Sequence, residues 1–268
     1  MNCPDAYSGA LRAEYALDFR QGECVVADRA EGRQMKAKTT LNALDDLRKA
    51  PAYPLAEAAR YLRLAPATLR SWCVGRPYQR RDGPAHFRPL IDLPGRDATI
   101  LSFENLVEAH VLRALRVEHS VSIKAVREAI RYAERSLQIK RLLTSRELRT
   151  HAGEILLDRY GELISLSRSG QLAMRKLLEA YLKRVEWNLS DVPFRLYPFV
   201  RGESDGAPRN IAIDPTIAFG RPVLLSHGVS TRAIVDRIDA GESLEEVAQD
   251  YELEPHSVEE AVLYERAA

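Results

Sequence analysis

The sequence lacks any run of eighteen apolar residues, so we expect no membrane-spanning helix. The first residues, MNCPDAYSGALRAEYALDFRQGE, do not join a positive start to an apolar stretch, so we expect no secretory signal. Cysteine is scarce, with only Cys3, Cys24 and Cys73. Their odd number and wide spacing give no disulfide framework and no metal motif. They fit a reducing cytosol, so a cytoplasmic location is expected.

Catalytic signatures are absent as well. The chain has no Gly-rich phosphate loop and no HExxH, GxSxG or CxxC motif. Asp214 followed by Pro215 is typical of a turn, and Ser226-His227-Gly228 is typical of a loop before a helix. The histidines are scattered at spacings that match no metal site: His86, His110, His119, His151, His227 and His256. The sequence therefore predicts no enzyme, no metal site and no cofactor.

A large net charge is also missing, because 39 Lys and Arg residues oppose 38 Asp and Glu residues. The charges are nevertheless unevenly placed. Seven arginines face three acids between residues 53 and 93, whereas nine acids face one arginine from residue 240 to the end. Such asymmetry suggests that the two ends of the chain have different partners.

The stretch YPLAEAARYLRLAPATLRSW, residues 53–72, predicts two short helices joined by a tight turn. The first helix has an apolar face made of Leu55, Ala58, Ala59 and Leu62. The second helix has Pro66 in its first turn and should end at Gly75 in a left-handed conformation. Its inward face is expected at Leu69, Trp72 and Cys73. The pair is either a packing unit or a helix-turn-helix whose second helix enters the DNA major groove.

The second helix and the segment after it carry residues suited to DNA. Thr68, Arg70 and Ser71 point away from the inward face. The two hydroxyls can donate to phosphate, and Arg70 can fork to guanine or hold a phosphate. A turn at 81–84 predicts a wing-like β-hairpin with strands near 86–93 and 99–102. This wing would bring three further arginines to flanking phosphates: Arg80, Arg81 and Arg88.

The alternative for residues 51–140 is a plain helical hairpin with a solvated basic face. The wing and the arginine cluster favour DNA binding over that alternative. Residues 1–50 show little periodicity and are predicted to form a mobile extension. Residues 35–38 (MKAK) fit an alternative translation start or an ordinary tail equally well.

Residues 141–200 predict a β-hairpin followed by an amphipathic helix. The hairpin is expected in EILLDRYGELISLS, around a turn at 159–162. The helix has one apolar stripe, formed by Met174, Leu177, Leu178, Tyr181, Leu182 and Val185. Because helix-turn-helix proteins usually match two-fold operators as homodimers, this stripe is a candidate dimer interface. The other possibility is that the chain's own hairpin covers it.

Residues 201–209 are rich in Gly, Ser, Asp and Pro and are predicted to be a linker. Residues 210–268 predict two short β-segments and helices near 230–239, 243–251 and 256–266. Capping boxes are expected at two helix starts, formed by Ser243 with Glu246 and by Ser257 with Glu260. The expected fold class is mainly α with small β elements.

Four segments carry a resemblance to a known fold: LAEAARYL, PATLRSW, HFRPLI and LVEAHVLRALRVEHSVSIKAVREAI. With them, residues 53–135 resemble a MerR-like winged helix-turn-helix. The resemblance implies that Thr68 and Arg70 lie on the recognition helix and that Arg88 meets the DNA backbone. Ala65 stands where a serine cap is usual, Trp72 stands where tyrosine is common, and the long dimerising coiled coil of MerR regulators is absent. An effector switch of the MerR type is therefore not implied.

The C-terminal segments DP…FGRPV, GESLEEVAQDY and VEEAVLYE are similar to a small domain of formerly unknown function in VapB-like antitoxins. The middle segment LISLSRSGQLAMRKLLEAYLKRVEW…RLYPF also resembles antitoxins in which the two domains occur together. The resemblance implies an antitoxin that neutralises a PIN-like ribonuclease toxin, usually encoded next door, and represses its own operator. The alternative is a stand-alone MerR-like transcription regulator.

The last two helices form a second helix-turn-helix by spacing, but the final helix is acidic and would repel phosphate. We therefore expect it to bind protein, with Glu259, Glu260 and Glu265 as the candidate toxin contacts. A homodimer contact is a further possibility. A solvated acidic face without a partner is the remaining alternative.

Overall fold

The computed structural model describes residues 25–27, 34–36, 47–80, 83–95, 99–115, 123–149, 151–163, 167–200 and 209–266. The chain divides into two units, Met1–Asp46 and Leu47–Ala268. In the first unit, β1 (Val25–Ala27) pairs with β2 (Gln34–Lys36) in an antiparallel ladder. The rest of the expected extension lies outside the described residues up to position 46. The same holds for Arg81 and for all but the last position of the predicted linker.

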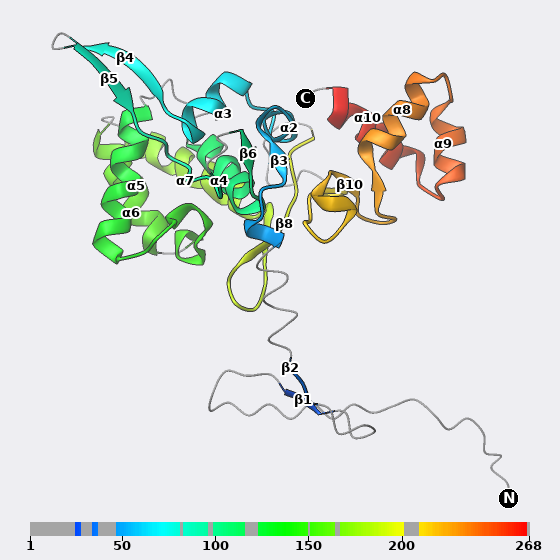
Figure 1. Cartoon of the computed structure of the whole chain (residues 1–268), viewed down its shortest axis with the longest axis horizontal. Coiled ribbons are helices and arrows are strands. Elements are labelled where there is room, and N and C mark those ends of the chain that lie inside the picture. Colours follow the sequence, from blue (N-terminus) through cyan, green and yellow to red (C-terminus); the bar gives the residue numbers. More distant parts are fainter. Residues whose placement is uncertain are drawn as a thin grey trace, which may run out of the picture. The chain divides into compact units, whose positions relative to one another are not determined.

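The predicted helix-turn-helix is present in the second unit (Figure 1). It consists of α2 (Leu55–Tyr61) and α3 (Pro66–Cys73), and the inward-facing residues of both helices are buried as expected. Pro66 occupies the first turn of α3, and Ala65 provides no side-chain cap. Gly75 has a φ of +80°, and a Cβ there would lie 2.0 Å from the carbonyl oxygen of Phe87. Only glycine can therefore turn the chain at this point.

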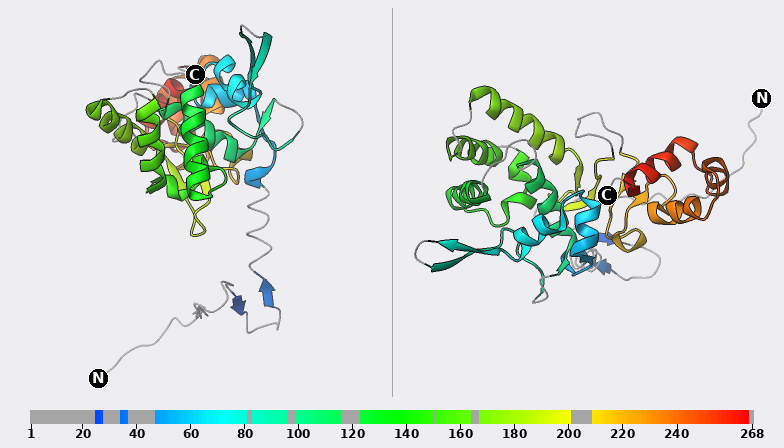
Figure 2. Two further views of the ribbon diagram at one scale, coloured as in Figure 1. Left: turned by 90° about the vertical axis from the view of Figure 1, so that its left-hand side faces the viewer. Right: turned by 90° about the horizontal axis from the view of Figure 1, so that it is seen from above.

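A two-stranded hairpin follows α3, but its strands are not the predicted ones. It pairs β4 (Arg76–Arg80) with β5 (Gly83–Phe87). The segment at 99–102 instead contributes β6 (Ile100–Leu101), which pairs with β3 (Tyr53–Pro54) in front of α2. The first strand of the hairpin lies before the predicted turn, whereas the sequence predicts both strands after it. Figure 2 shows this hairpin extending away from the helices in both views.

Four longer helices build the main core: α4 (Phe103–Ala114), α5 (Ile123–Leu137), α6 (His151–Leu163) and α7 (Arg168–Leu182). Two short 3-10 helices, η1 (Leu142–Thr144) and η2 (Arg146–Arg149), connect α5 to α6. A capping box of Ser102 and Asn105 starts α4. Helix α4 is buried on nearly all sides and forms the centre of this core.

The β-hairpin predicted in EILLDRYGELISLS is wrong, because residues 154–163 of this segment lie in α6. A short apolar run suits a strand and a helix equally well, so the sequence alone does not distinguish them here. The buried Leu156 and Tyr160 lie four residues apart and therefore share one helical face. The hairpin of this region comes after the long helix instead, as β7 (Val185–Trp187) and β8 (Pro193–Leu196).

The apolar stripe of α7 is buried inside the chain, so its prediction as a dimer interface is wrong. Each of its six predicted members is at most 8% exposed; five lie on α7, whereas Val185 begins β7. Helix α7 packs against α4 and α6, and Tyr181 contacts the rings of His110 and Phe199. A second copy of the chain would have to bind elsewhere.

The C-terminal part has its own small core. A three-stranded antiparallel sheet, β9 (Ile211–Ala212), β10 (Val223–Leu224) and β11 (Val229–Ser230), carries one further strand than predicted. It precedes the helices α8 (Thr231–Asp239), α9 (Leu244–Asp250) and α10 (Pro255–Arg266), close to the predicted bounds. A short 3-10 helix, η3 (Ala218–Gly220), lies between β9 and β10.

One of the two predicted capping boxes is present. Ser243 accepts from the Glu246 backbone while the Glu246 carboxylate accepts from the Ser243 backbone. The box at Ser257 is wrong, because α10 begins two residues earlier and the Ser257 N–H donates to the Glu254 carbonyl. The fold class is thus confirmed as mainly α with small β elements. No described helix combines the length and apolarity that crossing a membrane requires.

Candidate nucleic-acid interface

Helix α3 presents one long cation to solvent. Leu69 and Trp72 are completely or almost completely buried, which fixes the inward face of the helix. Arg70 lies on the opposite face and is exposed, and it forms no ion pair with the described residues. An unpaired guanidinium on an exposed helix face is available for a bidentate contact to guanine or phosphate.

The hydroxyls of Thr68 and Ser71, which were predicted to contact DNA with Arg70, are less accessible than the Arg70 side chain. Thr68 and Ser71 are half-buried. The Ser71 hydroxyl donates to the Thr68 carbonyl at 2.8 Å, as serine commonly does within a helix. Ser71 is therefore not a free donor to phosphate in this conformation, although its oxygen can still accept.

The base of the β4–β5 hairpin is fixed by aromatic and cationic contacts. Tyr78 and Phe87 stack across the two strands with ring centroids 4.0 Å apart. The guanidinium groups of Arg76 and Arg127 lie 5.7 and 5.6 Å from the Phe87 ring. Arg127 comes from α5 and also donates to the Arg88 carbonyl. The hairpin is thus attached to α5 at its base, which gives it a defined direction.

Of the arginines predicted on the wing, Arg88 is exposed and follows β5 directly. Arg80 is the last residue of β4, and Arg81 lies outside the described residues. The structure therefore brings Arg88 next to α5 through its backbone and places Arg76 at the opposite position of the ladder from Phe87.

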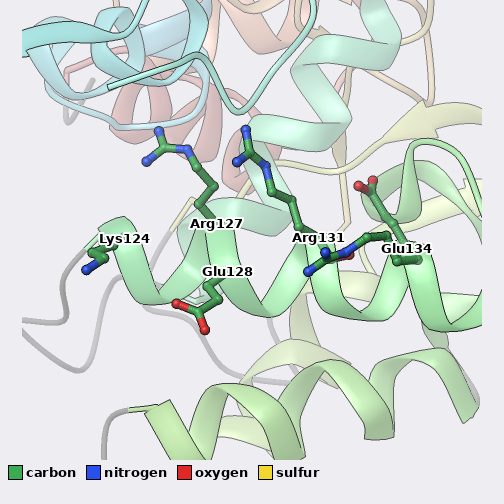
Figure 3. Close-up of a pocket in the computed structure, with 6 residues that line it drawn as sticks. Lys124, Arg127, Glu128, Arg131 and Glu134 are labelled. Carbon is green, nitrogen blue, oxygen red and sulfur yellow. The ribbon is translucent and has the colours of Figure 1, made fainter. Parts of the chain in front are cut away.

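Helix α5 carries a basic stripe that is not among the residues predicted from the sequence. Its members are Lys124, Arg127, Arg131 and Arg135, which are three and four residues apart and share one helical face. They line a shallow groove, together with Glu128 and Glu134. Figure 3 shows the guanidinium groups of Arg127 and Arg131 extending to the same side of the helix, with Glu128 on the other side. The i, i+3, i+7, i+11 spacing of the cations was the signal that could have revealed the stripe.

The two acids of this groove are engaged elsewhere. Glu128 accepts from Arg159 of α6 at 3.2 Å, and Glu134 accepts from the backbone N–H of Leu142 at 3.2 Å. Arg131 and Arg135 are exposed and form no ion pairs with the described residues. Burial lowers the pKa of Arg127, and the neighbouring charge of Arg131 lowers it further. A bound anion such as a phosphate would reduce the repulsion between Arg127 and Arg131.

The acidic residues predicted on α10 do not form one exposed face. Glu259 is exposed, but Glu260 and Glu265 are buried. The Glu260 carboxylate accepts from the Asn210 side chain at 2.6 Å. Glu265 accepts from the Thr231 hydroxyl at 2.6 Å and forms an ion pair with Arg60. The expectation of an acidic stripe on α10 is wrong because two of its three carboxylates hold the fold together.

Helix α10 packs against the first helix of the helix-turn-helix. The Tyr264 hydroxyl donates to the Tyr61 carbonyl at 3.0 Å, and burial raises the Tyr264 pKa well above its usual value. The Arg60 ion pair with Glu265 lies in the same contact. Residues about 200 positions apart in sequence are thus joined, so the C-terminal helices hold α2 in place. Among the described residues, no group of three or more His, Cys, Asp or Glu could hold a metal ion.

Two family models match parts of the chain. Residues 51–130 match a family described as a "Putative DNA-binding HTH domain", and residues 211–264 match one described as a "Protein of unknown function (DUF433)". The "Putative antitoxin VapB45" of Mycobacterium tuberculosis (strain ATCC 25618 / H37Rv) is 30% identical over 233 residues, covering 79% of this chain and 92% of the relative. The crystal structure of Rv2018 from Mycobacterium tuberculosis has a TM-score of 0.58 at 22% identity, covering 80% of this chain and 98% of that chain. This last likeness supports the fold.

Proposed function

The chain belongs to the family of the putative antitoxin VapB45. On this premise we propose that it is the antitoxin of a type II toxin–antitoxin pair. In this proposal it binds and neutralises a PIN-like ribonuclease, and it represses its own promoter by binding operator DNA. We place this activity in the cytoplasm, where promoter and toxin are both accessible, and we propose that the chain acts as a homodimer through a surface other than the α7 stripe.

The observation that carries the DNA-binding part is the combination of an exposed Arg70 on α3, which has no ion pair with the described residues, with a basic stripe on α5. The β4–β5 hairpin lies between them in sequence and is attached to α5 by Arg127. In this proposal α3 enters the major groove, and the hairpin serves as a wing. Arg88, Arg131 and Arg135 then neutralise flanking phosphates and release counterions. Thr68 would support Arg70 on the same helix, while Arg80 and Arg81 would extend the wing's contacts.

The toxin-binding part rests on the C-terminal helices, whose exposed residues include several carboxylates. Glu259 keeps its proposed role there, and Glu245 on α9 is a second exposed carboxylate. Glu260 and Glu265 would act only indirectly, since their carboxylates already bind Asn210, Thr231 and Arg60. A ribonuclease needs a basic surface for RNA, so exposed carboxylates would speed association with it. Copurification with the product of the neighbouring reading frame tests this part, and a stand-alone regulator would have no such partner.

The Arg70→Ala variant is expected to bind the DNA upstream of its gene more weakly by about 1–3 kcal/mol, because a bidentate base contact is lost. Its affinity for a shuffled duplex should change much less. The matched variant is Arg131→Ala, on α5. It should weaken binding to both duplexes alike and reduce the slope of log K against log salt by about one, because a phosphate contact carries no sequence information.

Fluorescence anisotropy over a salt series, with both variants and both duplexes, provides the measurement. If Arg70→Ala keeps the affinity and the salt slope of the wild type, α3 does not contact the bases. If Arg131→Ala keeps the wild-type slope, the α5 stripe does not meet the phosphates.

A further inference from the structure

The loop between β9 and β10 exposes a phenylalanine almost completely. Phe219 is 94% exposed, so its ring gains almost no packing within its own chain. Its backbone is left-handed, with φ 55° and ψ 32°, and the preceding Ala218 also has a positive φ of 45°. A left-handed conformation is costly for a bulky residue. The loop therefore combines two destabilising features, a strained backbone and an exposed apolar ring.

This loop is held in place by contacts on both sides of the ring. Asp214 is only 3% exposed. It accepts from the Thr216 N–H at 2.9 Å and from the Thr216 hydroxyl at 2.6 Å, and it forms an ion pair with Arg195 at 2.9 Å. Gly220 has a φ of +75°, and a Cβ there would lie 2.1 Å from the Tyr53 hydroxyl oxygen. These contacts hold the loop in one conformation. Less conformational entropy is therefore lost when a partner covers the Phe219 ring.

An arginine, Arg221, follows Phe219 two residues later in the sequence. Arg221 is exposed and forms no ion pair with the described residues. It also lines a groove of about 250 Å³, together with Glu57, Arg60, Pro222, Arg232 and Glu265. The two carboxylates of that groove are engaged, Glu57 by the Tyr61 hydroxyl and Glu265 by Arg60 and Thr231. An exposed aromatic ring and an exposed guanidinium two residues apart have the composition of a protein-binding hot spot.

We propose that Phe219 and Arg221 form the anchor by which this chain docks its protein partner. The partner surface is expected to offer an apolar cavity for the ring, with a carboxylate at its rim for the guanidinium. A second copy of the chain fits less well, because a two-fold contact centred on this loop would place Arg221 against the Arg221 of the other copy. The inference rests on the proposed function, in which that partner is the toxin encoded next to this chain.

The test uses the full chain and the purified product of the neighbouring reading frame. The Phe219→Ala variant is expected to bind that product about 30-fold or more weakly, because an aromatic anchor is lost. The control is Leu189→Ala, which removes an equally exposed apolar side chain, 106% exposed in the turn between β7 and β8, and should leave affinity unchanged. Upstream DNA binding should be the same in all three proteins.

A second variant, Phe219→Gly, separates docking from folding. Glycine adopts a positive φ without strain, so its melting temperature should equal or exceed that of the wild type while partner affinity is lost. Wild-type affinity in either Phe219 variant, or unfolding of both, overturns the inference. A change from dimer to monomer in light scattering also overturns it, because a second copy would then be the occupant. If the wild type itself does not bind the product of the neighbouring reading frame, the proposed function is wrong. The docking inference, which rests on it, is then wrong as well.

Discussion

Replacing Trp72 with alanine is expected to lower the free energy of unfolding by about 3–5 kcal/mol and to abolish binding to upstream DNA. Trp72 is 1% exposed and is the largest side chain of the inward face of α3. Its backbone carbonyl accepts from the N–H groups of Leu90 at 2.7 Å and Ile91 at 3.1 Å. These bonds hold the segment after β5 against the end of α3. A cavity here removes the support of the helix that carries Arg70 and of the hairpin beside it.

The chain contains two tryptophans, and the other provides the control. Trp187 lies in β7 and is only half-buried, so Trp187→Ala should cost much less and leave DNA affinity unchanged. Urea unfolding followed by far-UV circular dichroism gives the two stabilities. Equal losses for the two variants would show that Trp72 does not support α3 in the way described.

Mild acid is expected to destabilise the protein through His110, with a loss of about 2 kcal/mol between pH 7 and pH 5. The ring is buried, and Nε2 lies 3.1 Å from the Tyr181 carbonyl oxygen, so the neutral ring donates there. Burial lowers the His110 pKa from 6.5 to about 3, and the charges of Arg113 and Arg184 add to this. Below pH 6.5 His110 is therefore protonated in the unfolded chain but stays neutral in the folded chain. Stability is complete above pH 6.5 and is lost progressively as the pH falls toward 3.

The variant His110→Gln keeps a donor for the Tyr181 carbonyl but cannot titrate. Its stability should therefore fall less than that of the wild type between pH 7 and pH 5. Burial raises the pKa of Glu108, which acts in the opposite direction, but this contribution is the same in both proteins. The control His256→Gln changes an exposed histidine and should follow the wild type. Parallel stability curves for His110→Gln and the wild type would show that His110 is not the group that senses acid.

The helix-turn-helix could be predicted because local rules fix it. An apolar face at helical spacing, a proline in a first turn and a glycine at a left-handed position each act over a few residues. The C-terminal helices were predicted closely for the same reason. The β-hairpin predicted at 154–167 was wrong because a short apolar run suits a strand or a helix. Only packing of α6 against α5 and α7 decides between the two.

The candidate site shows the same division. Arg70 could be placed outward from the burial of its neighbours, which is a local argument. The burial of Glu260 and Glu265 could not be predicted in this way. Glu260 binds Asn210, which is 50 residues away in sequence, and Glu265 binds Arg60, which is 205 residues away. The exposure of Phe219 was equally hidden, since an isolated phenylalanine in a sequence is normally expected in a core.

The most direct test of the account is the affinity of the full chain for the DNA upstream of its own gene. It should be measured at physiological salt beside a shuffled duplex of the same length and composition. The account predicts a preference of about 10³-fold or more for the upstream DNA, as specific protein–DNA complexes show. Equal affinity for the two duplexes would contradict it, because α3 would then not distinguish one sequence from another.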